Sequence, residues 1–230
     1  MNALLNFDYK IIESDKNFTS LKIVNDYLTI PGLAITIGNS LRRILLGCVM
    51  GTAVVNLKVN KPENDSIFLE SVREDFFDII NNIKKISLRA SKSESCDAKI
   101  VIKGPAVVTA GDLIVPKHLI IVNPQQYLFT IVNDTTFDLG LKIEQGFGYK
   151  FYNENYTNFI ENPTTKIIDA NFSPVTKVNY KVLLEESYSF PNKMVESLIL
   201  EIWTNGSITP IRAFLEANKI LSSVFTSLIR

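Results

Sequence analysis

Two apolar helical stripes, one near each end of the chain, constrain its fold more than any other feature. The first follows Gly38-Asn39-Ser40 at the helical spacing i, i+3, i+4, i+7, and Asn39 or Ser40 is its expected N-cap. It consists of Leu41, Ile44, Leu45 and Cys48. The second follows Thr209-Pro210, where proline suits the first helical position. It consists of Ile211, Phe214, Leu215, Leu221, Val224, Phe225 and Leu228. A terminal helix this apolar is expected to dock within the chain or between subunits.

The chain between these stripes is dominated by strand signals. Residues 53–60 alternate, with Val55, Leu57 and Val59 on one face, as in a half-buried strand. Further strands are expected at 21–30, 98–103, 119–122, 128–132, 139–145, 175–184 and 197–203. Another helix is expected at 75–86, with Ser71 and Glu74 forming its capping box. This mixture over 230 residues predicts an α+β fold with room for one large domain or two small ones.

The composition excludes several classes of function. Lys+Arg and Asp+Glu both number 24, which argues against a free-standing nucleic-acid binder because phosphate neutralisation dominates such binding. His118 is the only histidine, and Cys48 and Cys96 lie far apart, so neither a histidine metal site nor a zinc or disulfide framework is expected. No run of 18 apolar residues predicts a membrane span. The first ten residues predict no targeting signal.

We find no constellation that predicts catalysis. The glycines near the first helix fit neither the dinucleotide-binding nor the P-loop spacing. His118 is expected to be structural, and the pairs Glu74-Asp75 and Glu185-Glu186 to lie on solvated faces. The irregular, aromatic-rich stretch 146–163 has one interleaved cation, so we expect packing there rather than base stacking. The sequence therefore predicts no catalytic, cofactor-binding or metal-binding residue.

Arg42 and Arg43 stand out because they are two of only six arginines and interrupt an apolar helix. Adjacent helical residues diverge by about 100° around the axis, so the two side chains do not share one exposed line. One interpretation is a solvated stripe. The other is that one guanidinium flanks an interface, where it binds carboxylates or backbone carbonyls.

Five motifs in order along the chain resemble the bacterial and plastid RNA polymerase alpha subunit family. They are Ile35–Leu46, Arg73-Glu74-Asp75 with the helix to Lys84, Gly104–Asp112, Asp169–Val175 and Thr204–Pro210. The sequence departs from the family at Ile35, where histidine is usual. It also departs at Gln145-Gly146-Phe147-Gly148-Tyr149, where the family has Arg-Gly-Arg-Gly-Tyr.

The resemblance implies an alpha-subunit N-terminal architecture in two parts. Residues 1–50 plus 175–230 would form a discontinuous dimerisation domain, and residues 51–174 an inserted, strand-rich α+β domain. Family members usually continue into a small DNA-binding domain, which is not expected here because the sequence stops at Arg230.

The implied function is that of a non-catalytic subunit of DNA-dependent RNA polymerase. A homodimer would serve as the assembly platform for the beta and beta-prime subunits, which hold the catalytic magnesium. No cofactor is implied in this subunit, and it would meet DNA only through the complex, with no membrane contact. Three alternatives stay open. The first is a stand-alone homodimeric protein-binding module, and the second is an alpha-like subunit of an archaeal or nuclear polymerase. An enzyme in its own right is the third.

The resemblance also implies contact residues. Arg43 and Leu46 match beta-contact positions, and the Gly38-Asn39 turn would set the entry angle of their helix. Lys84 and Ile168 match positions associated with the beta-prime contact. The implied dimer interface comprises Leu41, Ile44, Leu45, Phe214, Leu221, Val224, Phe225 and Leu228. Abundant Ile, Asn and Lys indicate an A/T-rich genome. Together with the DNA-binding domain and targeting signal that are not expected here, this composition favours a plastid-encoded subunit over one from the cytoplasm of a bacterium with A/T-rich DNA.

Overall fold

The computed structural model describes residues 8–24, 30–59, 71–91, 94–151, 165–187 and 194–229, which divide into two compact units. Unit 1 comprises Met1–Val49 and Ser173–Arg230, and unit 2 comprises Met50–Phe172. The compact units divide at 49/50 and 172/173, whereas the divisions that the resemblance implied lie at 50/51 and 174/175. Helices and strands occur together, so the predicted α+β class is confirmed.

Unit 1 joins both ends of the chain in one antiparallel sheet with strand order β1-β2-β14-β13. Its strands are β1 (Asp8–Ser14), β2 (Phe18–Val24), β13 (Val175–Glu186) and β14 (Met194–Thr204). Strand β14 pairs with β2 from Ser197 opposite Val24 to Trp203 opposite Phe18. One face of the sheet carries alternate apolar residues, including Leu21, Leu198 and Leu200, all buried.

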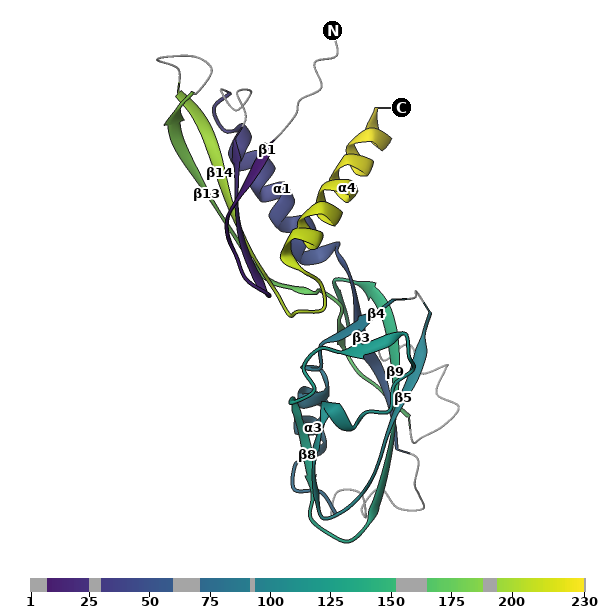
Figure 1. Ribbon diagram of the computed structural model, residues 1–230. Helices are drawn as coiled ribbons and strands as arrows, with labels where there is room; N and C mark the ends of the chain where they lie inside the picture. Colours follow the sequence, from purple (N-terminus) through teal and green to yellow (C-terminus); the bar gives the residue numbers. More distant parts are fainter. Residues whose placement is uncertain are drawn as a thin grey trace. The chain divides into compact units, whose positions relative to one another are not determined.

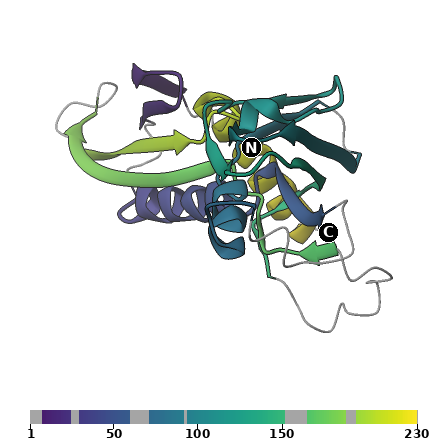
Figure 2. The same ribbon diagram turned by 90° about the horizontal axis from the view of Figure 1, so that it is seen from below.

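Two helices pack in unit 1, and Figure 2 shows α1 (Leu33–Gly47) alongside the long strands β13 and β14. The start of α4 (Pro210–Leu228) lies beside the end of α1, and α4 then diverges from it (Figure 1). As predicted, Thr209 and Pro210 begin this helix, although the Thr209 side chain makes no capping hydrogen bond. The shared core of unit 1 includes Ala34, Leu41, Leu45, Leu198, Leu200, Ala213, Phe214 and Ala217.

Helix α1 begins at Leu33, well before the predicted cap at Asn39 or Ser40, which is wrong. Ser40 lies inside the helix and donates its hydroxyl proton to the Thr36 carbonyl at 2.8 Å. The N-terminal amides are satisfied from another element: the Glu196 carboxylate on β14 accepts from Gly32 N at 2.8 Å and Ala34 N at 3.0 Å. This carboxylate replaces a local cap, so the apolar segment 33–37 becomes helical.

Unit 2 is built on a larger antiparallel sheet with order β5-β9-β3-β4-β7, and β11 also pairs with β3. Its strands are β3 (Met50–Val59), β4 (Leu88–Ala90), β5 (Cys96–Lys103), β7 (Leu119–Ile121), β9 (Thr136–Phe147) and β11 (Thr165–Ile167). Two smaller pairs are β6 (Ala106–Thr109) with β8 (Tyr127–Ile131), and β10 (Tyr149–Lys150) with β12 (Ala170–Asn171). A 3-10 turn, η1 (Ala110–Asp112), follows β6.

Helix α3 (Phe76–Ile83) buries Ile79 and Ile83 in the core of unit 2. Its N-cap is Asp75, whose carboxylate accepts from Asp78 N at 2.7 Å, so the predicted Ser71–Glu74 capping box is wrong. The Glu74 carboxylate instead accepts from the Tyr127 hydroxyl and from Thr130 N on β8. Glu74 is therefore not on a solvated face, because both of its carboxylate oxygens accept hydrogen bonds from residues of β8.

Some expectations fall on residues that the structure does not describe. The expected strand 21–30 is found within β2 as far as Val24, and residues 25–29 lie outside the described ranges. Within the aromatic stretch, Phe147, Tyr149 and Phe151 are described, whereas 152–164 are not.

Candidate interaction surfaces

Helix α1 has two faces of different character. Leu41 and Leu45 point into the core of unit 1 and are 1% and 0% exposed. Arg42 and Arg43 are exposed, and within the described parts of the chain neither guanidinium makes an ion pair. Leu46 is half-buried beside them. The exposed face thus offers two uncommitted guanidinium groups next to a partly covered apolar side chain.

Gly38 fixes how closely α1 lies to the sheet. A Cβ atom at this position would stand 2.8 Å from Tyr180 Cδ2 and 2.9 Å from Leu198 Cδ1. Such separations are below van der Waals contact, so the glycine allows the helix to pack against β13 and β14. Gly38 and Asn39 lie within α1, so the expectation that they form a turn is wrong. Asn39 is exposed on the helix surface.

The residues proposed for a dimer interface fall into two groups. Leu41, Leu45 and Phe214 are buried within unit 1, and Phe214 makes an edge contact with the Tyr9 ring at 5.3 Å between centroids. Side chains so enclosed leave no surface for a second subunit, so the expectation for these three is corrected. Ile44 and Leu221 are half-buried at the margin of the core.

The second half of α4 contributes the other group. Val224, Phe225 and Leu228 are 49%, 55% and 74% exposed. The first half of the same helix is covered, with Ala213 and Ala217 buried. A helix whose apolar side chains emerge from the core into solvent has the pattern of a docking surface. We call Val224, Phe225 and Leu228 the α4 apolar face.

A second surface surrounds Lys84 at the end of α3. Lys84 Nζ lies 3.5 Å from Asp169 Oδ2, and the Tyr149 hydroxyl donates to the same oxygen at 3.2 Å. Partial burial, together with the charge of Asp169 and this hydrogen bond, raises the pKa of Tyr149. Ile168 is 6% exposed, lies in the core and donates its backbone N–H to the Val55 carbonyl. Ile168 therefore supports this surface from below, and its side chain offers little area to a partner.

The residues screened for chemistry lie apart. His118 is half-buried, and its Nε2 has no hydrogen-bond partner within the described residues. Cys48 and Cys96 are free thiols; burial, and then the charge of Asp97, raises the pKa of Cys96. In the described ranges no group of three or more His, Cys, Asp or Glu side chains is placed to hold a metal ion. Nor is any helix there long and apolar enough to cross a membrane.

Comparisons with known proteins match both units. The family model described as the RNA polymerase Rpb3/RpoA insert domain matches residues 67–173, most of unit 2. The DNA-directed RNA polymerase subunit alpha of Gracilaria tenuistipitata var. liui is 39% identical over 198 residues, 84% of this chain and 60% of the relative. Those of Trieres chinensis and Porphyra purpurea are 37% and 38% identical over 86% of this chain and 62% of each relative. The chain spans about three-fifths of the length of these relatives.

Proposed function

Because the chain belongs to the family of DNA-directed RNA polymerase alpha subunits, we propose that it is a non-catalytic subunit of such a polymerase. Two copies associate, and the dimer carries the beta and beta-prime subunits during assembly. The phosphoryl-transfer chemistry and its magnesium belong to those large subunits, and this chain meets DNA only through the complex.

The α4 apolar face is the observation that carries the proposal of a dimer. Each large apolar side chain that leaves water contributes about 1.5–3 kcal/mol, and a two-fold interface uses every such side chain twice. Val224, Phe225 and Leu228 supply the contact, with Leu221 and Ile44 at its margin. The formal charge of zero adds little repulsion between copies.

The exposed face of α1 supports a contact with the beta subunit. Arg43 extends into solvent without an ion pair in the described part of the chain, next to half-buried Leu46. An arginine fork beside an apolar residue suits a carboxylate or backbone carbonyls of a partner. Packing of Gly38 against Tyr180 and Leu198 holds this face in place.

The surface around Lys84 supports a contact with the beta-prime subunit. One oxygen of the Asp169 carboxylate pairs with the Lys84 ammonium and accepts a hydrogen bond from the Tyr149 hydroxyl. Because Ile168 anchors Asp169 to the core of unit 2, the position of the lysine is restricted before a partner arrives. Such preorganisation lowers the entropic cost of binding.

We further propose that the chain works in a plastid. The relatives named above come from algae, and the abundance of Ile, Asn and Lys agrees with the A/T-rich coding expected of such a genome. A bacterial cytoplasm is the alternative. The names of these relatives favour an alpha subunit over an alpha-like subunit of an archaeal or nuclear polymerase.

The test is native mass spectrometry of the complex purified through a tag on this chain. The proposal predicts two copies together with one beta-type and one beta-prime-type subunit. A bare dimer at cellular concentration would contradict assembly on this platform and favour the stand-alone binding module. A monomer would contradict both.

A further inference from the structure

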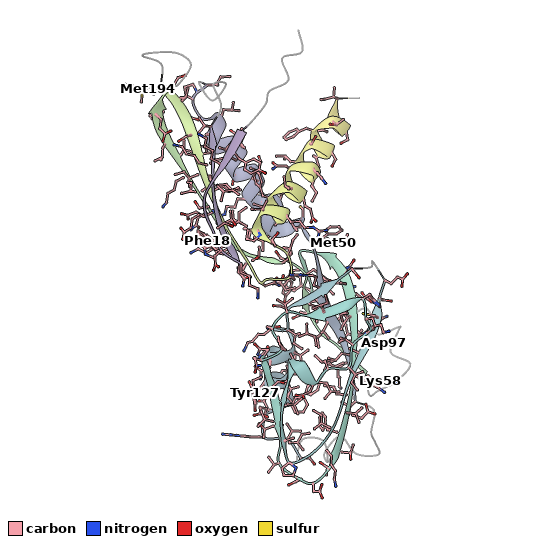
Figure 3. The ribbon with its side chains drawn as sticks, viewed as in Figure 1. Phe18, Met50, Lys58, Asp97, Tyr127 and Met194 are labelled. Carbon is pink, nitrogen blue, oxygen red and sulfur yellow. The ribbon has the colours of Figure 1, made fainter. Side chains whose placement is uncertain are left out.

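The solvent-facing side of the unit 2 sheet carries a hollow that none of the surfaces described above uses. Strands β3, β9 and β5 form it, with a volume of about 390 Å³. Its lining includes Asn56, Lys58, Asp97, Lys99, Gly140 and Lys142, and Figure 3 labels Lys58 and Asp97. We call it the basic hollow.

The strand register explains why a hollow forms here. Gly140 on β9 lies opposite Lys58 on β3 and opposite Lys99 on β5. Residues paired in this way point to the same side of the sheet, and neighbouring strands lie about 4.8 Å apart, so the two lysine backbones are separated by about 10 Å. Glycine has no side chain, so Gly140 forms the floor between the two lysines.

The next row of the same register adds polar groups. Lys142 on β9 lies opposite Asn56 on β3 and opposite Asp97 on β5. The intervening residues Leu57 and Leu141 point to the other side and are buried in the core of unit 2. The hollow therefore rests on a packed sheet, and its backbone geometry is set before any ligand binds.

The three lysines of the hollow differ in whether they form an ion pair. Lys142 Nζ lies 3.5 Å from Glu144 Oε1, further along β9. The ammonium groups of Lys58 and Lys99 make no ion pair with any described residue. Two uncompensated cations thus face each other across a glycine floor, with one carboxylate, Asp97, at the rim.

We infer that the basic hollow binds an acidic, extended segment of a partner protein. Carboxylates two residues apart in an extended chain are separated by about 7 Å, a distance that the flexible side chains of Lys58 and Lys99 reach across. A basic residue of the same segment pairs with Asp97. The Asn56 amide supplies a hydrogen bond to the segment's backbone or side chains.

A nucleic acid fits these charges less well. Its affinity grows with the number of phosphates that a protein neutralises. Glu144 pairs with Lys142, and the Asp97 carboxylate in the lining adds a second negative charge, so both acidic groups repel a continuous phosphate backbone. A protein segment that alternates acidic and neutral residues avoids this repulsion and still reaches Lys58 and Lys99.

The test measures binding of labelled probes to the full chain by fluorescence anisotropy. The first probe is a ten-residue peptide that alternates glutamate and threonine and ends in lysine; its partner replaces every glutamate with glutamine. A ten-nucleotide single-stranded DNA is the third. The variant is the double substitution Lys58→Gln, Lys99→Gln. The control is Lys103→Gln, which removes one positive charge from β5, the strand of Lys99, outside the hollow, where Lys103 pairs with Asp134.

We expect the acidic peptide to bind the unmodified chain, and the double substitution to weaken it about five- to tenfold, as two exposed ion pairs allow. The Lys103 variant and the glutamine peptide distinguish binding in the hollow from attraction to the overall charge of the chain. The Lys103 variant should bind the acidic peptide with an affinity within about twofold of that of the unmodified chain. The glutamine peptide should bind the unmodified chain much more weakly than the acidic peptide does. No binding of the acidic peptide, equal losses in both variants, or tighter binding of the DNA with the same dependence on Lys58 and Lys99 would overturn the inference. Because the hollow shares no residue with α1, α4 or the Lys84 surface, failure here leaves the proposed assembly role untouched.

Discussion

Helix α1 buries a stripe along its whole length, whereas α4 buries one only along its first half. In α1 the buried positions run from Ala34 through Leu41 to Leu45. In α4 they end at Ala217, and Phe225 and Leu228 emerge into solvent. The two helices carry similar apolar periodicity. Periodicity alone therefore indicates that an apolar face must be covered, but it does not identify whether the same chain or a partner covers it.

The same contrast exists between two phenylalanines of α4. Phe214 is 4% exposed and contacts Tyr9, whereas Phe225 is 55% exposed. Phe214→Ala should lower the free energy of unfolding by about 3–5 kcal/mol through loss of burial and creation of a cavity. Phe225→Ala should leave that free energy within about 0.5 kcal/mol and weaken the dimer instead. Urea unfolding at a concentration where the chain is monomeric, paired with sedimentation equilibrium, measures both. Equal losses of monomer stability in the two variants would contradict the different environments assigned to Phe214 and Phe225.

The exposed face of α1 should act on a partner and not on the fold. Arg43→Ala removes an uncommitted guanidinium, so the dimer should stay folded while binding of the beta subunit weakens by about 2–5 kcal/mol. Arg212→Ala is the matched control, because Arg212 is exposed on α4 and pairs only with Glu216 among the described residues. A pull-down in which the Arg43→Ala dimer retained the beta subunit at unchanged affinity would contradict this role.

The N-terminus of α1 depends on the Glu196 carboxylate of β14. Glu196→Ala removes the acceptor of the Gly32 and Ala34 amides and leaves one half-buried and one buried donor unpaired, at an expected cost of about 1–3 kcal/mol. Glu186→Ala, an exposed carboxylate on the neighbouring strand β13, should change stability by less than about 0.5 kcal/mol. Chemical denaturation of both variants decides whether the long-range cap is real.

The close approach of α1 to the sheet gives an expected effect of the same size as the loss of the Glu196 carboxylate. Gly38→Ala places a methyl group against Tyr180 and Leu198, which should cost about 1–3 kcal/mol through overpacking. Gly47→Ala meets open space at the end of the same helix and should stabilise by up to about 1 kcal/mol through helix propensity. Thermal unfolding of both variants measures the two changes in stability. If Gly38→Ala were as stable as Gly47→Ala, the side chains of Tyr180 and Leu198 would accommodate the methyl group without loss of stability.

The sequence predicted what depends on local patterns and missed what depends on distant partners. Proline at Pro210 and the apolar periodicity identified α4, and alternation identified β3 and β13. The early start of α1 was missed because its cap, Glu196, lies 162 residues from Ala34. The role of Glu74 was missed because Tyr127 and Thr130 reach it from β8.

The candidate surfaces follow the same rule. Arg43 and Lys84 are accessible where the resemblance placed contacts, because a charged side chain on a helix surface keeps its charge in water. Leu41, Leu45 and Ile168 are enclosed instead, since an apolar position in a motif serves equally well for a core or an interface. The basic hollow was not predicted, because it arises from pairing among three strands that are far apart in sequence.

Hydrogen exchange at the last turns of α4, measured across a dilution series of the full chain, tests the central claim most directly. If two copies associate through the α4 apolar face, the amides of residues 221–228 should gain protection as concentration rises, while those of residues 211–217 stay protected throughout. Unchanged exchange at residues 221–228 in a sample that sedimentation shows to be dimeric would place the interface elsewhere and contradict the account.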